Sequence, residues 1–375
     1  MHKQNQEIIA RSPAVVKLLG EHAVVYGKLC IAAAVEQYAN VKIEIGSTDA
    51  IELEFTNISG ADSRQETTSS KIASIYNEFA SRDSISKFLE KQNGENMLLL
   101  PCAVIIGRLN HEFDADIKGI KITFSSDIPM QYGLASSAAL STALVVALVK
   151  LANVKISNEK IIDIARDGER IIHENENAGR IDVNTSFYGN IVSFDAKFGA
   201  NPHKLDYEIL LMLIDTGPKK KTSEMVAKVA ELYKKDKNNT EKILNKIDMC
   251  SAEGLSAIEK RDFQMMAEII MKDSNNMHAT MLDTWPPIMY LNDNSKEIIY
   301  AIHELNDKKN KYVAAYTFDA GANAHIITTT DYANDVFDVL KGISGIKSTI
   351  QSGLGMGPKI KNNGSLIDVD KLGPK

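Results

Sequence analysis

The alternation of hydrophobic and polar positions predicts a β-rich first third of the chain. Residues 41–45 and 51–55 alternate with period two, as the strands of a sheet with one solvent-exposed face do. The apolar runs 102–109 and 117–124 predict two further strands. Helical spacing then takes over, and the helices expected in this half cover residues 72–89, 137–154 and 158–172.

The second half begins with a continuous apolar run. Residues 209–214 predict a buried strand that ends in a turn at residues 215–218. Helices are expected across 223–272 and over 297–305, and strands over 312–318 and 324–329. We place a domain boundary near residues 195–203. This gives domains 1–197 and 198–375, with a last strand near 347–358 as a candidate to return to the first domain.

Composition limits the classes of function. The chain has 375 residues, of which 44% are hydrophobic and 25% charged, so it should form a globular protein with a sizeable core. The net charge of -6 argues against nucleic-acid binding, which needs a basic face. Cys30, Cys102 and Cys250 lie far apart and have neither metal-ligand nor disulfide spacing. With a polar N-terminus and no membrane-spanning run, we expect a cytoplasmic protein that does not bind membranes.

The segment 129–138 carries the clearest chemical signal in the chain. It follows the predicted strand 117–124, contains Gly133, and opens a helix at Ser136 and Ser137. Free backbone N–H groups and the positive end of a helix dipole make such a turn an anion site. The segment therefore predicts phosphate binding. Ordinary N-capping by the two serines is the open alternative.

Three further polar positions are candidates for chemistry. Asp319 lies in an Asp-Ala-Gly turn between two predicted strands, where it is either a turn-forming residue or an acid–base group. Lys17 interrupts an apolar segment and needs an anionic partner, either a phosphate or a structural carboxylate. Asp182 belongs to a polar cluster with Arg180 and Thr185 that is either a loop or the floor of a substrate site.

Taken together, these segments resemble the superfamily of galacto-, homoserine, mevalonate and phosphomevalonate kinases, which includes the diphosphomevalonate decarboxylases. Segment 129–138 resembles its phosphate loop, Pro-x-x-x-Gly-Leu-x-Ser-Ser-Ala. The second half is similar to the decarboxylases, and the strings that carry this similarity lie at residues 273–280, 286–292, 315–324 and 355–358.

The first half is mixed in its resemblance. Residues 18–27, 169–173 and 181–182 look like mevalonate kinase, in which the position of Asp182 is the catalytic base. The early lysine of that kinase would fall at Val15, whereas Lys17 stands where the decarboxylases keep theirs. The late glycine-rich motif of the kinase is also replaced by the turn around Asp319.

The resemblance implies a two-domain α+β fold. A domain like the second domain of ribosomal protein S5 would pack against a ferredoxin-like domain, with the active site between them. Asp319 would take the place of the catalytic aspartate of the decarboxylases, and Lys17 would meet phosphate. The decarboxylases hold the substrate carboxylate with an arginine, a position that aligns with Thr185, so Arg180 is the candidate replacement. Decarboxylases of this family are commonly dimers, which makes a homodimer an expectation of the resemblance alone.

Bulky residues in the phosphate loop decide the expected reaction. ATP-using relatives have small residues where this chain has Met130, Gln131 and Tyr132, and we expect these side chains to fill the space of a triphosphate. We therefore expect ATP-independent decarboxylation of mevalonate 3,5-bisphosphate to isopentenyl phosphate, with neither a cofactor nor a metal.

Three alternatives remain open. The first is an ATP-dependent phosphomevalonate or diphosphomevalonate decarboxylase, in which Asp319 deprotonates the 3-hydroxyl and Ser136 helps to hold Mg-ATP. The second is a mevalonate kinase with Asp182 as base. The third is an inactive relative that senses a phosphorylated isoprenoid.

Overall fold

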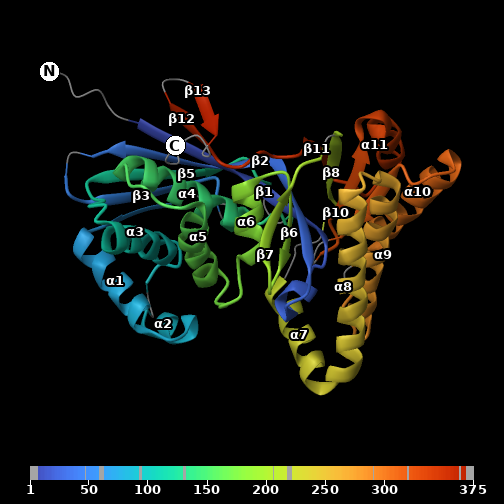
Figure 1. Ribbon diagram of the computed structural model, residues 1–375, viewed down its shortest axis with the longest axis horizontal. Coiled ribbons are helices and arrows are strands. Elements are labelled where there is room, and N and C mark those ends of the chain that lie inside the picture. The colour runs from blue at the N-terminus through green and yellow to red at the C-terminus, as the bar shows by residue number, and fades with distance from the viewer. Residues whose placement is uncertain are drawn as a thin grey trace.

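Two β-sheets, each covered by helices, make up the protein. In the computed structural model, the described residues are 7–46, 48–58, 63–92, 95–129, 132–205, 207–217, 222–289, 291–318, 321–362 and 365–368. In Figure 1 the larger sheet and its helices lie at the left of the molecule, and the smaller sheet with the long helices α8 and α9 lies at the right. The expected two-domain α+β architecture is confirmed.

Within the described residues, nine strands form the N-terminal sheet in the order β13-β12-β1-β2-β5-β3-β4, with β6 paired to β2 and β7 to β6. Only the β3–β5 pair is parallel among these pairings. The strands are β1 (Glu7–Leu19), β2 (Cys30–Ile45), β3 (Ile51–Thr56), β4 (Ser63–Thr67), β5 (Ile120–Ser126), β6 (Ile191–Asp195), β7 (Gly199–His203), β12 (Lys359–Asn362) and β13 (Ser365–Asp368).

Helices cover one face of this sheet (Figure 1). They are α1 (Ser69–Ser81), α2 (Ile85–Lys91), α3 (Leu99–Phe113), α4 (Ser136–Ala152), α5 (Asn158–Ile172) and α6 (Arg180–Tyr188). The single helix expected over 72–89 is two helices, because the chain is extended at Arg82 and Ser84 caps a new start. The strand expected over 102–109 is wrong: this run lies in α3, which is buried on nearly every side, so its apolar residues show no helical period.

The C-terminal sheet is antiparallel, in the order β11-β8-β10-β9. Its strands are β8 (Ile209–Asp215), β9 (Ala314–Thr317), β10 (Ala324–Thr329) and β11 (Ser348–Gly353). The helices of this half are α7 (Thr222–Lys235), α8 (Lys237–Glu259), α9 (Phe263–Leu282), α10 (Asp293–Lys309) and α11 (Ala333–Lys341), with short 3-10 turns at Ala23–Tyr26 and Thr330–Tyr332. None of the helices in the described part of the chain has the length and hydropathy needed to span a bilayer.

Strand pairing moves the expected domain limits. The boundary between residues 197 and 198 falls inside the β6–β7 hairpin, so the change of sheet comes after His203. The strand expected near 347–358 is β11, which pairs with β8 and so stays in the C-terminal sheet. The strand that returns to the N-terminal sheet is the next one, β12, which pairs with β1. In the segment between β11 and β12, Leu354 forms a bridge with Val35 and Met356 forms one with Gly189, both in the N-terminal half.

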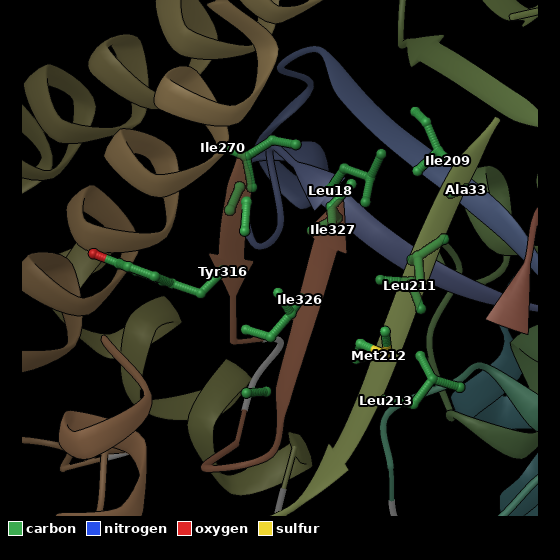
Figure 2. Packing of buried hydrophobic residues seen from close by; sticks show 14 of the residues in the cluster. Leu18, Ala33, Ile209, Leu211, Met212, Leu213, Ile270, Tyr316, Ile326 and Ile327 are labelled. Atoms are coloured by element: carbon green, nitrogen blue, oxygen red, sulfur yellow. The ribbon is translucent and has the colours of Figure 1, made fainter. Parts of the chain in front are cut away.

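A hydrophobic core runs across the junction of the two sheets. Figure 2 shows Leu18 and Ala33 on neighbouring strands of the first sheet, near Ile209 and Leu211 on β8. Tyr132 from the loop before α4 belongs to the same buried cluster. Because this core fixes β1 against β8, it also fixes the position of the polar residues that β1 carries on its other face.

Candidate functional site

The loop before α4 has the backbone of an anion site. Gly133 has φ 78°, in the region that favours glycine, and Ala135 is left-handed with φ 46°. Ala135 occupies the N-cap position and no side chain caps the helix, so neither Ser136 nor Ser137 is the capping serine. The first-turn N–H groups of α4 are therefore not satisfied by a side-chain cap, which leaves them available to a phosphate.

Tyr132 corrects the expectation about this loop. We expected its side chain to fill the space of a triphosphate. Instead the side chain is only 7% exposed and packs in the core between the sheets. Its hydroxyl also hydrogen-bonds to the hydroxyl of Ser348 on β11, so the tyrosine fixes the loop to the C-terminal sheet. Met130 and Gln131, the other two bulky positions, lie outside the described residues.

Lys17 and Asp182, two of the predicted site residues, form an ion pair. The Lys17 Nζ lies 3.0 Å from Asp182 Oδ1, and each side chain is 17% exposed. Val15, on the same face of β1 as Lys17, packs against Ile181 of α6, which brings strand and helix together. Burial disfavours the charged form of Lys17, but Asp182 and Glu21 outweigh it and hold the lysine pKa above its usual value.

Gly179 sets the start of α6 and thereby the position of Asp182. Its φ is 72°, and an added Cβ would come within 2.7 Å of the Cβ of Glu169 on α5. A larger residue would push α6 away from α5, so glycine is required by both the close approach and the backbone angle.

The ion pair opens into a cleft of about 420 Å³, which we call the substrate cleft. Arg180 lines it and forms no ion pair with any described residue, so its charge is available to an anion. Thr185 does not reach the cleft: it is fully buried in α6, and its hydroxyl has no hydrogen-bond partner among the described residues. Of these two predicted substrate-binding residues, the structure therefore brings only Arg180 to the cleft.

Asp319 lies outside the described residues. The strands on either side of it, β9 and β10, pair as expected, with His325 opposite Thr317. Phe318, directly before it, is fully buried and packs near His278. The two predicted strands that flank Asp319 are thus confirmed, while its catalytic role stays a prediction.

Two buried carboxylates were missed as site residues by the sequence reasoning. Asp273 of α9 accepts a hydrogen bond from the backbone N–H of Gly20 at 3.0 Å, and its burial raises its pKa to about 7. Glu169 of α5 lies beneath His173, 3.5 Å from its Nε2. The Nε2 of His173 also lies 3.3 Å from the hydroxyl of Ser137 at the start of α4. The spacing Glu169–His173, four residues apart on a helix, was the available signal.

A second cavity adjoins the phosphate loop. This loop cavity measures about 250 Å³, and mainly apolar side chains such as Phe124, Ile105 and Leu144 line it. Ser136 and Ser137 stand at its polar end. The two cavities are linked by the contact between Ser137, which lines the loop cavity, and His173, which lines the substrate cleft.

Comparison with known proteins agrees with this architecture. Residues 100–190 match the family "GHMP kinases N terminal domain", and residues 239–363 match "Mevalonate 5-diphosphate decarboxylase C-terminal domain". These two matched segments are thus similar to GHMP kinases in the first half and to mevalonate 5-diphosphate decarboxylases in the second. The crystal structure of mevalonate diphosphate decarboxylase from Staphylococcus aureus covers 96% of this chain and 99% of that one, with TM-score 0.69 at 18% identity. The mevalonate kinase of Methanococcus jannaschii covers 95% and 99%, with TM-score 0.68 at 18% identity.

Two curated proteins that are similar to this chain are diphosphomevalonate decarboxylases. The diphosphomevalonate decarboxylase of Debaryomyces hansenii is 34% identical over 226 residues, which is 59% of this chain and 57% of that protein. The enzyme of the same name from Rattus norvegicus is 54% identical over 74 residues, 20% of this chain and 18% of that protein. The chain thus matches little more than half the length of the first of these relatives.

Proposed function

We propose that this protein decarboxylates a phosphorylated mevalonate in the substrate cleft. The ion pair between Lys17 and Asp182 carries the proposal, because it sets an ammonium group in a cleft that His173 also lines. His173 in turn contacts Ser137 at the start of α4, which has no side-chain cap. Similarity of the C-terminal half to mevalonate 5-diphosphate decarboxylases supports the same class of reaction. Arg180, free of ionic partners among the described residues, supplies the charge that a substrate carboxylate or 5-phosphate needs.

We further propose that the substrate arrives already phosphorylated at the 3-position. Mevalonate 3,5-bisphosphate would then lose CO₂ and the 3-phosphate to give isopentenyl phosphate. The C3–O bond breaks with its electron pair on the phosphate, and the electrons of the carboxylate-bearing bond form the double bond. Lys17 and the first N–H groups of α4 would meet the charge that develops on the leaving phosphate. Asp319 would stabilise the electron-poor carbon.

The phosphate loop supports this ATP-free reaction because it is anchored, and not because Tyr132 fills the space of a triphosphate. Tyr132 anchors the loop to β11 through its buried ring and the contact with Ser348. A loop that is fixed in this way has less freedom to wrap around a triphosphate than a loop of small residues has. Phosphoryl transfer from ATP depends almost entirely on such positioning of the phosphates.

ATP-dependent diphosphomevalonate decarboxylation is the second candidate, and the names of the curated relatives favour it over the first. The loop cavity also fits it, since an apolar space of about 250 Å³ beside Ser136 and Ser137 suits a nucleobase whose phosphates rest on the α4 start. Bound Mg-ATP would supply the 3-phosphoryl group, with Ser136 among the residues that hold its phosphates. Elimination would then follow in the same cleft.

One assay of CO₂ release separates the candidates. The protein is incubated with mevalonate 3,5-bisphosphate without nucleotide, and separately with mevalonate 5-phosphate or 5-diphosphate plus Mg-ATP. Release in the first arm supports the ATP-free reaction, and release only in the others supports the second candidate. A further arm with mevalonate and Mg-ATP, followed by ADP formation without CO₂, detects a mevalonate kinase.

Asp319→Asn tests the catalytic carboxylate in the productive arm. Turnover should be lost while the far-UV circular dichroism spectrum and melting temperature stay those of the parent. Activity near the parent level would remove Asp319 from the mechanism.

A further inference from the structure

A leaving phosphate needs more than a fixed positive charge. Near neutral pH a phosphate monoester is largely dianionic, so cleavage of its C–O bond would release the strongly basic phosphate trianion. A proton delivered during bond cleavage releases the weaker base, hydrogen phosphate, instead. The site therefore calls for an acid within reach of the 3-phosphate.

We propose that His173 is this general acid. It follows the end of α5 and lines the substrate cleft together with Lys17 and Asp182. Its Nε2 lies 3.3 Å from the hydroxyl of Ser137, in the first turn of α4. A phosphate bound at that helix start is thus one hydrogen bond away from the imidazole, which is the reach that proton transfer requires.

The surroundings of His173 favour its protonated form. Glu169, whose side chain is only 2% exposed, lies 3.5 Å from Nε2, and its other oxygen has no partner among the described residues. The contact with Glu169 raises the pKa of His173, opposed by burial; Asp182 raises it further and Lys17 lowers it. The position at the C-terminal end of α5 adds the favourable interaction of a cation with the helix dipole.

The other cations of the cleft are poor acids. Lys17 is paired with Asp182 and its pKa is raised, so it holds its proton. Arg180 carries a guanidinium, which does not deprotonate in proteins. These two groups give permanent charge, whereas an imidazolium gives up its proton readily. Their roles are therefore complementary.

The proposed step is balanced. The C3–O bond breaks with its electron pair on the phosphate oxygen, and the C1–C2 pair becomes the C2–C3 double bond as CO₂ leaves. The imidazolium proton passes to the phosphate oxygen, which gives hydrogen phosphate and neutral His173, and solvent restores the proton. This proposal rests on the proposed decarboxylation, but it holds for either candidate, since both eliminate a 3-phosphate.

His173→Asn tests the proposal in whichever arm of the assay is productive. We expect kcat to fall by about 10²–10⁴-fold, the usual contribution of a general acid, with a much smaller change in KM. In the parent protein kcat should fall as pH rises through the raised pKa of His173, and this alkaline limb should vanish in the variant. His111→Asn is the matched control, because His111 lies exposed near the end of α3 and lines neither cavity.

A substrate analogue separates acid catalysis from a structural role. A 3-sulfate ester leaves as a weak base and needs no proton, so the parent and His173→Asn should differ by less than about tenfold on it. An equal loss on sulfate and phosphate would overturn the proposal, as would unchanged kcat in the variant. His22 also lines the substrate cleft, so loss of the alkaline limb in His22→Asn instead of His173→Asn would overturn it too. No CO₂ from the parent in any arm would overturn the proposed function and this inference together.

Discussion

Replacing one partner of the ion pair between Lys17 and Asp182 should lower the free energy of unfolding. The size of the loss follows from the distance between the two groups and from their burial. At the 3.0 Å separation, an effective dielectric of about 20 gives an attraction of about 5.5 kcal/mol. Both side chains are mostly buried, at 17% exposed, so Asp182→Asn leaves an ammonium that water only partly compensates. Loss of one partner of a buried pair costs about 3–5 kcal/mol, and the access of the cleft to solvent lowers our expectation to about 2–4 kcal/mol.

Urea unfolding at pH 7 measures this cost directly. Asp83→Asn is the control, because it breaks an ion pair with Lys87 whose side chains are 72% and 58% exposed, and it should cost under about 0.5 kcal/mol. The double variant Lys17→Met/Asp182→Asn should recover at least about 1 kcal/mol relative to Asp182→Asn alone, since no unpaired charge remains. Equal losses for Asp182→Asn and Asp83→Asn, or no recovery in the double variant, would refute this reasoning.

Three further changes test other parts of the structure. Gly20→Ala should lower the free energy of unfolding by about 2–4 kcal/mol in urea titrations, because φ is +78° and the new Cβ would lie 2.2 Å from the carbonyl oxygen of Leu29; a loss under about 0.5 kcal/mol would contradict it. Burial raises the pKa of Asp273 to about 7 in the fold. The fold therefore has its full stability below the pKa of the unfolded chain and loses stability as pH rises toward 7, because the buried carboxyl must then ionise. Asp273→Asn should therefore be about 2–4 kcal/mol more stable than the parent at pH 8 and little different at pH 4, whereas a pH-independent difference would argue against the buried acid. Tyr132→Phe removes the hydroxyl contact with Ser348 and should cost about 0.5–1.5 kcal/mol in thermal unfolding, against no change if the hydroxyl is idle.

Local signals in the sequence were enough for the parts of the fold that depend on neighbouring residues. Strand β5, the turn at Gly133 and helix α4 follow from an apolar run, a glycine and a helical stripe. Helix α3 was mistaken for a strand because a helix buried all round has no polar face to set its period. Burial on every side is a tertiary property that local pattern does not record.

Most features of the site that we did not predict from the sequence depend on contacts between residues far apart in the chain. The bond between Gly20 and Asp273 joins residues 253 positions apart, and no local pattern reports it. Tyr132 was correctly identified as unusual, but its direction depends on β11, 216 positions away at Ser348. Lys17 was expected to need an anionic partner, and the structure supplies the structural carboxylate, Asp182, that was one of the two possibilities.

The stoichiometry of nucleotide use tests the central claim most directly. With mevalonate 3,5-bisphosphate in nucleotide-free buffer, CO₂ and inorganic phosphate should appear in a 1:1 ratio, and added Mg-ATP should change neither the rate nor the ratio. Release of CO₂ only when ATP is present, with one ADP formed for each CO₂, would contradict the account and assign the protein to ATP-dependent decarboxylation.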